Sequence, residues 1–284
     1  MEIRKVGVIG AGTMGHGIAH AAALGGFEVA LFDISEEVLD RALASIQRDL
    51  AKGVERGKVA AEDMEAALAR ITGTLTLEAV ADEADLLVEA VPEKLGLKQD
   101  LFRQLQELAP EGAIFATNTS SLSIAAIAGV LDDPGRVIGA HFFNPVHIMK
   151  LLELVVHEGT RDEVLAAVQG FGAAIGKTCI TVRDFPGFAT SRLGVCLGME
   201  AIRMVEQGVA SPEDIDTAMV LGYRHPIGPL KLTDLVGLDV RLHIGEYLAE
   251  ALGNPAFKPP QLMRDMVAEG RLGKKTGRGF YEWG

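Results

Sequence analysis

The sequence predicts a Rossmann-like α/β fold, a doubly wound and mostly parallel sheet, followed by an all-α C-terminal domain. Three observations predict it: a glycine-rich turn between an apolar strand and a helix, strands alternating with helices up to about residue 184, and no convincing strand afterwards. Such alternation is typical of parallel sheets covered by helices. Pro186 and Gly187 interrupt the pattern, so we expect two domains, 1–184 and 185–284.

The first helix begins at a turn that contains Gly10, Gly12 and Gly15, and Asp33 ends the next strand. In this frame Gly10 permits the tight turn, Gly12 lets the backbone approach a pyrophosphate, and Gly15 lets the helix pack closely. The helix N-terminus attracts phosphates. Asp33 can accept hydrogen bonds from both ribose hydroxyls and would repel a 2′-phosphate, which favours NAD over NADP. The alternative is a glycine-rich turn without a ligand.

The other elements of the first domain are predicted from apolar runs and from the residues that cap or interrupt them. Ser35 is a candidate cap for a long helix. The predicted strands are 6–9, 28–32, 85–91, 113–117, 137–143, 151–156 and 178–182, and the predicted helices are 36–56, 62–70, 97–108, 124–128 and 162–175.

Four helices are predicted in the second domain. They span 187–207, Ser211 to Gly222 with Pro212 in the first turn, 230–252 with Gly237 inside, and 259–268. Helical units of this kind commonly bury a face against a second subunit. We therefore expect a homodimer formed through the C-terminal domain.

Composition limits the classes of function. The chain has 284 residues, of which 48% are hydrophobic and 23% charged, which is typical of a folded protein. The net charge of −12 argues against a nucleic-acid partner. The apolar runs are too short for a membrane span, and the first strand begins too early for a signal peptide. Cys179 and Cys196 are interpreted as buried free thiols, which favours a cytoplasmic protein.

Polar side chains follow the later strands, at the edge where parallel sheets bind ligands. Ser120 follows one apolar strand, while His141 and Asn144 end another. A histidine suits proton exchange near neutral pH. Glu153, inside the next apolar strand, needs a partner, and pairing with His141 would satisfy it. The alternatives are a structural histidine and an ion pair from Glu153 to a neighbouring cation.

Lys52, Arg56 and Lys58 form the best candidate cluster for an anionic ligand, although from these residues alone a solvated helix end, with cations at its C-terminal dipole, is the favoured explanation. The other histidines lack Cys or carboxylate neighbours at ligand spacing, so we expect no metal site. No Gly-x-Ser-x-Gly motif is present, which argues against acyl hydrolysis.

Taken together, the motifs resemble those of the L-3-hydroxyacyl-CoA dehydrogenases, most closely the short bacterial 3-hydroxybutyryl-CoA dehydrogenases. The resemblance covers nearly the whole chain, with its motifs in the family's order. The matching stretches are Gly10-Ala-Gly-Thr-Met-Gly15, Val88-Glu-Ala-Val-Pro-Glu93, Asn118-Thr-Ser-Ser-Leu122, His141-Phe-Phe-Asn-Pro145, Asp184-Phe-Pro-Gly-Phe188, Ile215-Asp-Thr-Ala-Met219, Gly228-Pro-Leu230, Asp234-Leu-Val-Gly-Leu-Asp239 and Gly277-Arg-Gly-Phe-Tyr281.

The resemblance implies roles for individual residues. His141 matches the catalytic histidine and Glu153 its paired acid, whereas Ser120 and Asn144 match residues that contact substrate and nicotinamide. The cofactor contacts that it implies are Asp33, Ala90, Glu93, Lys98 and Lys275. The Lys52–Lys58 stretch falls where the family binds the phosphates of CoA.

One position departs from the family pattern. Ser191 stands where the family usually has an asparagine that holds the substrate carbonyl. The resulting hypothesis is reversible, NAD-dependent oxidation of a (3S)-3-hydroxyacyl-CoA to the 3-ketoacyl-CoA. Two alternatives remain: a dehydrogenase of a hydroxy or sugar acid without CoA, and an NAD-binding protein that has lost catalysis.

Overall fold

An eight-stranded sheet organises the first of two units, Met1–Asp184, in a computed structural model that describes all 284 residues. The strand order is β3-β2-β1-β4-β5-β6-β7-β8, and all neighbouring strands are parallel except β6 and β7. This confirms the predicted doubly wound, mostly parallel sheet. The strands are β1 (Lys5–Ile9), β2 (Glu28–Phe32), β3 (Ile71–Thr74), β4 (Leu86–Glu89), β5 (Ile114–Thr117), β6 (Val137–Phe142), β7 (Leu151–Val156) and β8 (Thr178–Arg183).

The chain leaves β1 in one direction along the sheet and resumes at β4 in the other, so the topological switch point lies between these two strands. Ligands of such sheets bind at this place, outside the carboxyl ends of the strands. The fold therefore directs attention to the residues that follow β1 and β4, and to the neighbouring ends of β5 and β6.

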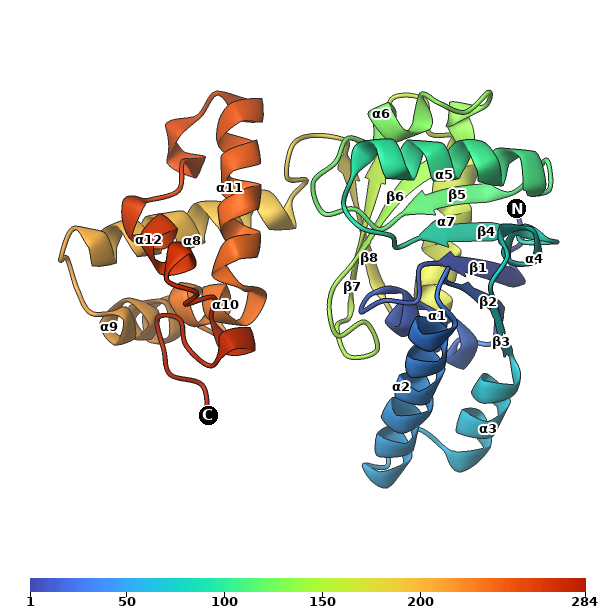
Figure 1. Cartoon of the computed structure of the whole chain (residues 1–284), viewed down its shortest axis with the longest axis horizontal. Helices are drawn as coiled ribbons and strands as arrows, with labels where there is room; N and C mark the ends of the chain where they lie inside the picture. The colour runs from blue at the N-terminus through green and yellow to red at the C-terminus, as the bar shows by residue number, and fades with distance from the viewer. The chain divides into compact units, whose positions relative to one another are not determined.

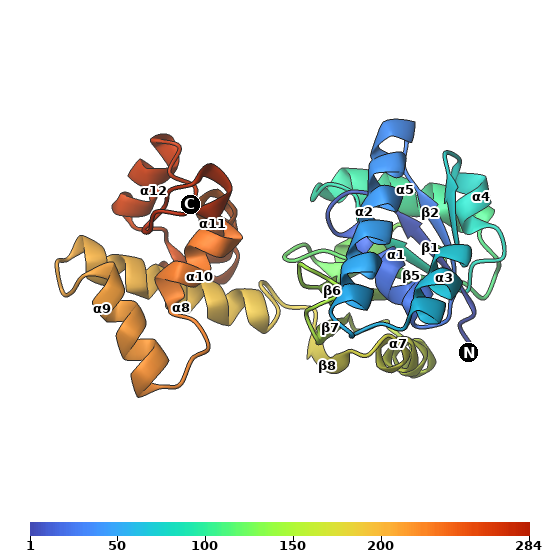
Figure 2. The same cartoon turned by 90° about the horizontal axis from the view of Figure 1, so that it is seen from below.

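Helices cover both faces of the sheet (Figures 1 and 2). One face packs against α1, α2, α3 and α7, and the other against α4, α5 and α6. As predicted, Ser35 caps α2, because its Oγ accepts a hydrogen bond from Val38 N. The helices are α1 (Gly15–Leu24), α2 (Glu36–Glu55), α3 (Ala61–Ala69), α4 (Leu77–Ala81), α5 (Leu95–Leu108), α6 (Ile124–Ala128) and α7 (Asp162–Ala174), with a short turn η1 (Pro134–Arg136).

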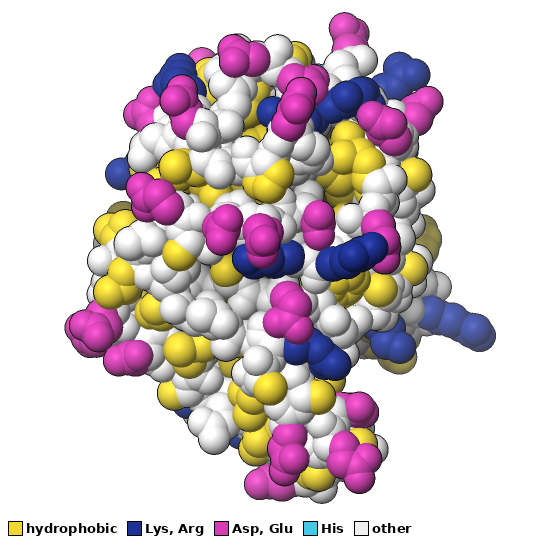
Figure 3. All heavy atoms as spheres, turned by 90° about the vertical axis from the view of Figure 1, so that its right-hand side faces the viewer, with side chains coloured by type: hydrophobic (Ala, Val, Ile, Leu, Met, Phe, Trp, Pro, Cys, Tyr) yellow, Lys and Arg dark blue, Asp and Glu magenta, His cyan; other side chains and the backbone are white.

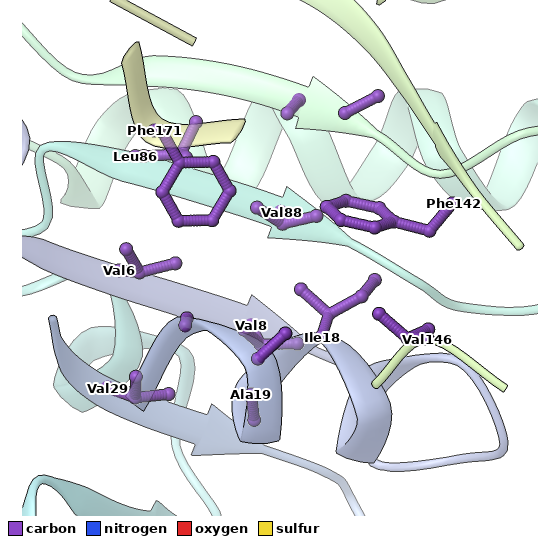
Figure 4. Packing of buried hydrophobic residues seen from close by; sticks show 14 of the residues in the cluster. Val6, Val8, Ile18, Ala19, Val29, Leu86, Val88, Phe142, Val146 and Phe171 are labelled. Atoms are coloured by element: carbon purple, nitrogen blue, oxygen red, sulfur yellow. The ribbon is translucent and has the colours of Figure 1, made fainter. Parts of the chain in front are cut away.

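The main core of this unit is aliphatic (Figure 4). Val8 of β1 and Val88 of β4 pack beneath Ile18 of α1, and Phe142 of β6 closes the cluster on one side. Because α1 is held by this core, its N-terminus is fixed at the end of β1, where a ligand would meet it.

The second unit, Phe185–Gly284, is all helical and has its own core, which includes Met199, Leu230 and Leu248. Asp234 holds the C-terminal segment by accepting hydrogen bonds from Phe280 N and Tyr281 N, each at 2.9 Å. The elements are α8 (Thr190–Glu206), α9 (Pro212–Thr217), η2 (Ala218–Gly222), α10 (Pro229–Val236), α11 (Leu238–Leu252), η3 (Pro255–Phe257), α12 (Gln261–Ala268) and η4 (Lys274–Thr276).

Several predicted boundaries were wrong. The single helix predicted over 230–252 is two helices, because Gly237 takes a φ of +106° that ends α10. The helix predicted from 187 begins at Thr190, and the strand predicted over 85–91 ends at Glu89. The short elements β3 and α4 were missed, because Ile-Thr-Gly-Thr of β3 has no apolar run and the cap of α4 at Thr76 was overlooked.

Charge is mixed over the part of the surface that Figure 3 shows. Acidic side chains are spread over this face, and basic ones lie among them without forming a continuous area. None of the helices is both long enough and apolar enough to cross a membrane.

Candidate active site

The glycine-rich turn leaves an open space over the N-terminus of α1. Gly10 has a φ of +98°, and a Cβ there would lie 2.8 Å from Ala90 O. A Cβ on Gly15 would lie 1.6 Å from Gly10 O, so this glycine is required by the turn itself more than by the packing of helix on sheet. A Cβ on Gly12 would meet no protein atom within 4 Å. Gly10 and Gly15 thus shape the turn, and Gly12 borders space that a ligand can fill.

Asp33 lies directly after β2, and its half-buried carboxylate is tied to the turn. Oδ2 accepts a hydrogen bond from Ala11 N at 2.9 Å, and Oδ1 accepts one from Ser35 N at 3.0 Å. These contacts orient the carboxylate beside the glycines, where the ribose of a nucleotide would lie.

A cavity of about 720 Å³ opens at this point, within the roughly 300–1,000 Å³ common for ligand sites. Gly12, Ala90 and Leu97 are among the residues that line it, and its only charged lining residues are Asp33 and Asp100. No cation is present there to hold a 2′-phosphate. The cradle of glycines, the oriented carboxylate and the cavity together fit NAD.

His141 and Glu153 face each other across the antiparallel pair of β6 and β7. His141 Nδ1 and Glu153 Oε2 lie 2.9 Å apart, and Glu153 has no exposed surface. The ring of Phe143 packs against the imidazole, with 4.5 Å between centroids. A carboxylate at Nδ1 favours the tautomer with hydrogen on that nitrogen, which leaves Nε2 as the proton acceptor.

The end of β5 is fastened to β6 next to this pair. Asn118 Oδ1 accepts a hydrogen bond from Phe142 N at 2.9 Å. Ser120 is half-buried two residues further on, and Asn144 is exposed in the loop after β6. The structure therefore places Ser120, His141 and Asn144 on segments that leave neighbouring strands at the same edge of the sheet.

Glu93 and Lys98 lie at the start of the α5 region. The side chain of Glu93 is one third exposed and accepts a hydrogen bond from Ser120 N at 3.0 Å. Lys98 has no exposed surface, and its Nζ lies 2.7 Å from Glu89 Oε1 and 3.2 Å from Glu93 Oε2. The expected direct contact of Lys98 with a cofactor is therefore not available in this position, because the ammonium is enclosed by two carboxylates.

Family models match both units of the chain. The model for the NAD-binding domain of 3-hydroxyacyl-CoA dehydrogenase matches residues 5–185, and the model for its C-terminal domain matches 187–283. The chain belongs to the 3-hydroxyacyl-CoA dehydrogenase family. It is therefore an NAD-dependent dehydrogenase, in agreement with the cavity beside Asp33.

Close relatives support this membership over the full length. A probable 3-hydroxybutyryl-CoA dehydrogenase of Bacillus subtilis is 43% identical, covering 100% of this chain and 98% of its own. The mitochondrial hydroxyacyl-coenzyme A dehydrogenase of Sus scrofa is 42% identical over 99% of this chain and 91% of its own. The (S)-3-hydroxybutyryl-CoA dehydrogenase of Ralstonia eutropha is 42% identical in sequence. Its crystal structure superposes on this chain with a TM-score of 0.95, and the match covers 100% of both chains.

The remaining candidate residues of this dehydrogenase lie away from the strand ends. Lys52, Arg56 and Lys58 are exposed around the end of α2, with Lys52 Nζ 4.0 Å from Asp49 Oδ1. In the second unit, Ser191 lies in the first turn of α8.

Lys275, also in the second unit, is paired with Asp239, its Nζ 2.6 Å from both carboxylate oxygens. The structure records no cluster of three or more His, Cys, Asp or Glu side chains that could hold a metal ion.

Sequence reasoning overlooked Glu89, which lies at the end of β4 with no exposed surface. The signal was available, because a carboxylate inside the apolar run Leu-Leu-Val-Glu-Ala-Val needs a partner for the same reason as Glu153. His20 was also passed over, although it is buried against His147, with parallel rings 5.1 Å apart.

Proposed function

We propose that the protein oxidises (3S)-3-hydroxyacyl-CoA to 3-ketoacyl-CoA reversibly, with 3-hydroxybutyryl-CoA as its preferred substrate. The observation that carries the proposal is the pair of His141 Nδ1 and Glu153 Oε2, 2.9 Å apart at the edge of the sheet that also bears the cofactor cavity. The names of the relatives from Bacillus subtilis and Ralstonia eutropha support the short acyl chain.

In this mechanism His141 is the general base. Its Nε2 takes the proton of the C3 hydroxyl, a role that contributes roughly 10²–10⁴-fold in rate. Glu153 stabilises the imidazolium that forms and keeps the ring in the required tautomer. The carboxylate can do so strongly because it is fully buried, where charge interactions are weakly screened.

NAD, when bound over Gly12 and Asp33, supplies the hydride acceptor. Ser120 and Asn144 orient the oxygen atoms of the substrate, which limits the geometries in which it can react. Lys52, Arg56 and Lys58 bind the phosphates of CoA, and their exposed ammonium and guanidinium groups support this assignment. Ser191 contacts the substrate with a hydroxyl where the family uses an amide, and Lys275 contacts the cofactor.

The decisive test is the pair of variants His141→Ala and Glu153→Gln. We expect kcat with acetoacetyl-CoA and NADH to fall roughly 10²–10⁴-fold in His141→Ala, and less in Glu153→Gln. NADH affinity, measured by fluorescence, should remain close to the wild-type value in both, because neither residue lines the cofactor cavity. Unimpaired turnover by His141→Ala would refute the assignment of the base.

The substrate class is tested with the wild-type protein. We expect the rate of NADH formation to be highest with 3-hydroxybutyryl-CoA and to fall as the acyl chain lengthens. A higher rate with free hydroxy or sugar acids would favour a dehydrogenase that does not use CoA. Tight NADH binding without turnover of any acyl-CoA would instead indicate a protein that has lost catalysis.

The same proposal includes a homodimer formed through the second unit and a location in the cytoplasm. The second unit exposes large apolar side chains, among them Leu193, Leu221 and Tyr223. Such side chains are common at subunit interfaces. Both cysteines are free thiols, which a reducing compartment would preserve, although each is half-buried and not buried as predicted.

A further inference from the structure

Glu89 is a buried carboxylate that the mechanism above does not use. It is the last residue of β4 and has no exposed surface. Its oxygens accept hydrogen bonds from Val91 N at 2.7 Å, from Thr117 Oγ1 at 2.6 Å and from Lys98 Nζ at 2.7 and 2.8 Å. These donors come from β5, α5 and the segment between β4 and α5, so they satisfy a charge that would otherwise be costly to bury.

The ammonium of Lys98 joins Glu89 to Glu93. Its Nζ lies 3.2 Å from Glu93 Oε2, while Glu93 Oε1 accepts hydrogen bonds from Thr119 Oγ1 and Ser120 N. Two carboxylates and one ammonium give this triad, Glu89, Lys98 and Glu93, a net charge of −1. Lys98 and Glu89 are fully buried, and only Glu93 reaches the surface.

The triad lies between the two parts of the proposed active site. In the strand order β1-β4-β5-β6, the glycine turn follows β1 and His141 is the penultimate residue of β6. Glu89 ends β4, Glu93 and Lys98 follow it in the loop and in α5, and Ser120 follows β5; both strands lie between β1 and β6. A dinucleotide that is bound at the glycines and reacts beside His141 must extend past the triad.

We propose that Glu89 is a positioning residue that acts on the cofactor by charge: together with Lys98 and Glu93 it gives the triad a net charge of −1, and this charge favours the cationic nicotinamide of NAD⁺ over the neutral nicotinamide of NADH. The inference rests on the proposed function, because His141 defines where the nicotinamide lies. No ligand atom can contact Glu89, since its carboxylate is enclosed by protein donors.

A net charge can discriminate between the two forms of the cofactor because they differ by one charge on the nicotinamide. Both forms share the pyrophosphate, the riboses and the adenine, so contacts with Gly12 or Asp33 strengthen or weaken them together. A charge in a partly buried site is weakly screened. A change of one unit in the triad is therefore expected to alter the ratio Kd(NAD⁺)/Kd(NADH) by roughly three- to tenfold.

The test is a series of variants of the whole protein that changes the charge of the triad. Glu89→Gln gives a net charge of 0, Lys98→Gln gives −2, and the double variant restores −1. We expect Kd(NAD⁺)/Kd(NADH) to rise roughly three- to tenfold in Glu89→Gln, to fall similarly in Lys98→Gln, and to return towards the wild-type ratio in the double variant. NADH is titrated by fluorescence and NAD⁺ by calorimetry, both without substrate.

Thr117→Val is the matched control, because it removes one hydrogen bond to Glu89 and no charge. Its ratio should equal that of the wild type, even if both affinities fall. An unchanged ratio in Glu89→Gln, or a shift of the same sign in Glu89→Gln and Lys98→Gln, would overturn the inference. If Glu89→Gln does not fold, the comparison of Lys98→Gln with the double variant still measures the effect of one unit of charge.

The proposed function and this inference fail separately. If His141→Ala keeps the kcat of the wild type, the proposed function is overturned. If turnover does depend on His141 but Kd(NAD⁺)/Kd(NADH) is unchanged in Glu89→Gln, only the inference about Glu89 is overturned.

Discussion

Two carboxylates of the first unit, Glu89 and Glu153, lie inside apolar strands without any exposed surface. Each is satisfied by side chains on neighbouring elements: Glu153 by His141, and Glu89 by Lys98 and Thr117. Removing one partner of a buried pair commonly costs about 3–5 kcal/mol, because a charge is left without compensation. Both carboxylates stand at the edge of the sheet where the reaction is proposed, which explains burial that stability alone would not favour.

His20 of α1 is a buried group with a consequence for pH. Burial in the first place, and then the neighbouring His147, lower the pKa of His20 to about 4 from 6.5. The carboxylate of Asp49 acts in the opposite direction, whereas His16 and Lys177 lower it slightly. Because the folded-state pKa lies below the unfolded one, the folded state binds fewer protons at acidic pH. The contribution of neutral His20 to stability is therefore complete above pH 6.5 and is lost as the pH falls towards 4.

We predict that His20→Gln is less sensitive to acid than the wild type. The difference in unfolding free energy between the two proteins should shift by about 3 kcal/mol, at most, in favour of the variant between pH 7 and pH 4. Urea denaturation at a series of pH values measures it, with His243→Gln, at an exposed histidine of α11, as the control in which His20 and His147 both remain. A difference that stays constant over this range would contradict the lowered pKa.

At the scale of elements, the three glycines between β1 and α1 meet two requirements: the backbone geometry of the turn and space for the ligand. Gly10 and Gly15 are needed by the backbone, whereas Gly12 borders open space beside the cavity. Separate roles were predicted for the three glycines from the motif alone, and the neighbouring atoms change the role of Gly15, which the turn itself requires.

We predict that Gly15→Ala and Gly12→Ala differ. A Cβ on Gly15 would collide with Gly10 O, so Gly15→Ala should lose about 2 kcal/mol or more of stability together with NAD affinity. Gly12→Ala should lose affinity at least tenfold, by filling the space of the ligand, while its stability changes by about 0.5 kcal/mol or less. Thermal unfolding and NADH titration separate the effects, and equal losses of stability would count against this distinction.

At the scale of the whole molecule, the chain divides at Asp184 into two units with separate cores. The last residues of the chain complete the second unit, because Asp234 accepts hydrogen bonds from Phe280 N, Tyr281 N and Trp283 Nε1. This explains the glycine-rich closing motif, since a Cβ on Gly279 would lie 2.1 Å from Asp234 Oδ1.

We predict that the protein is a dimer in solution and that Leu221→Glu combined with Tyr223→Glu weakens it. Light scattering should give about twice the chain mass of 30.2 kDa for the wild type and a lower mass for the variant. Ile148→Glu, at an exposed apolar position of the first unit, is the control that should leave the mass unchanged. A wild-type mass of one chain would remove the dimer from the proposal.

Apolar periodicity and the residues that cap or break elements were sufficient for the long helices and for strands with a clear apolar run. Helix α2 was predicted from its Ser35 cap and its apolar stripe, and strands β5 and β7 from short apolar runs. The predictions failed where an element had no apolar run, where a cap was overlooked, or where a break depended on a dihedral angle, as in β3, α4 and the break at Gly237. A strand-end position indicated His141, and the cost of a carboxylate in an apolar strand indicated Glu153, but no spacing could show that Lys98 is enclosed by Glu89 and Glu93.

The sequence by itself determined the class of the fold, the glycine turn followed by Asp33, and the family, because these are properties of local order along the chain. Only the tertiary structure decided which charged groups meet: the 2.9 Å contact of His141 with Glu153, and the triad of Glu89, Lys98 and Glu93. The reason is physical, since the register of β6 against β7 and the position of α5 over β4 are set by the packing of residues far apart in the chain.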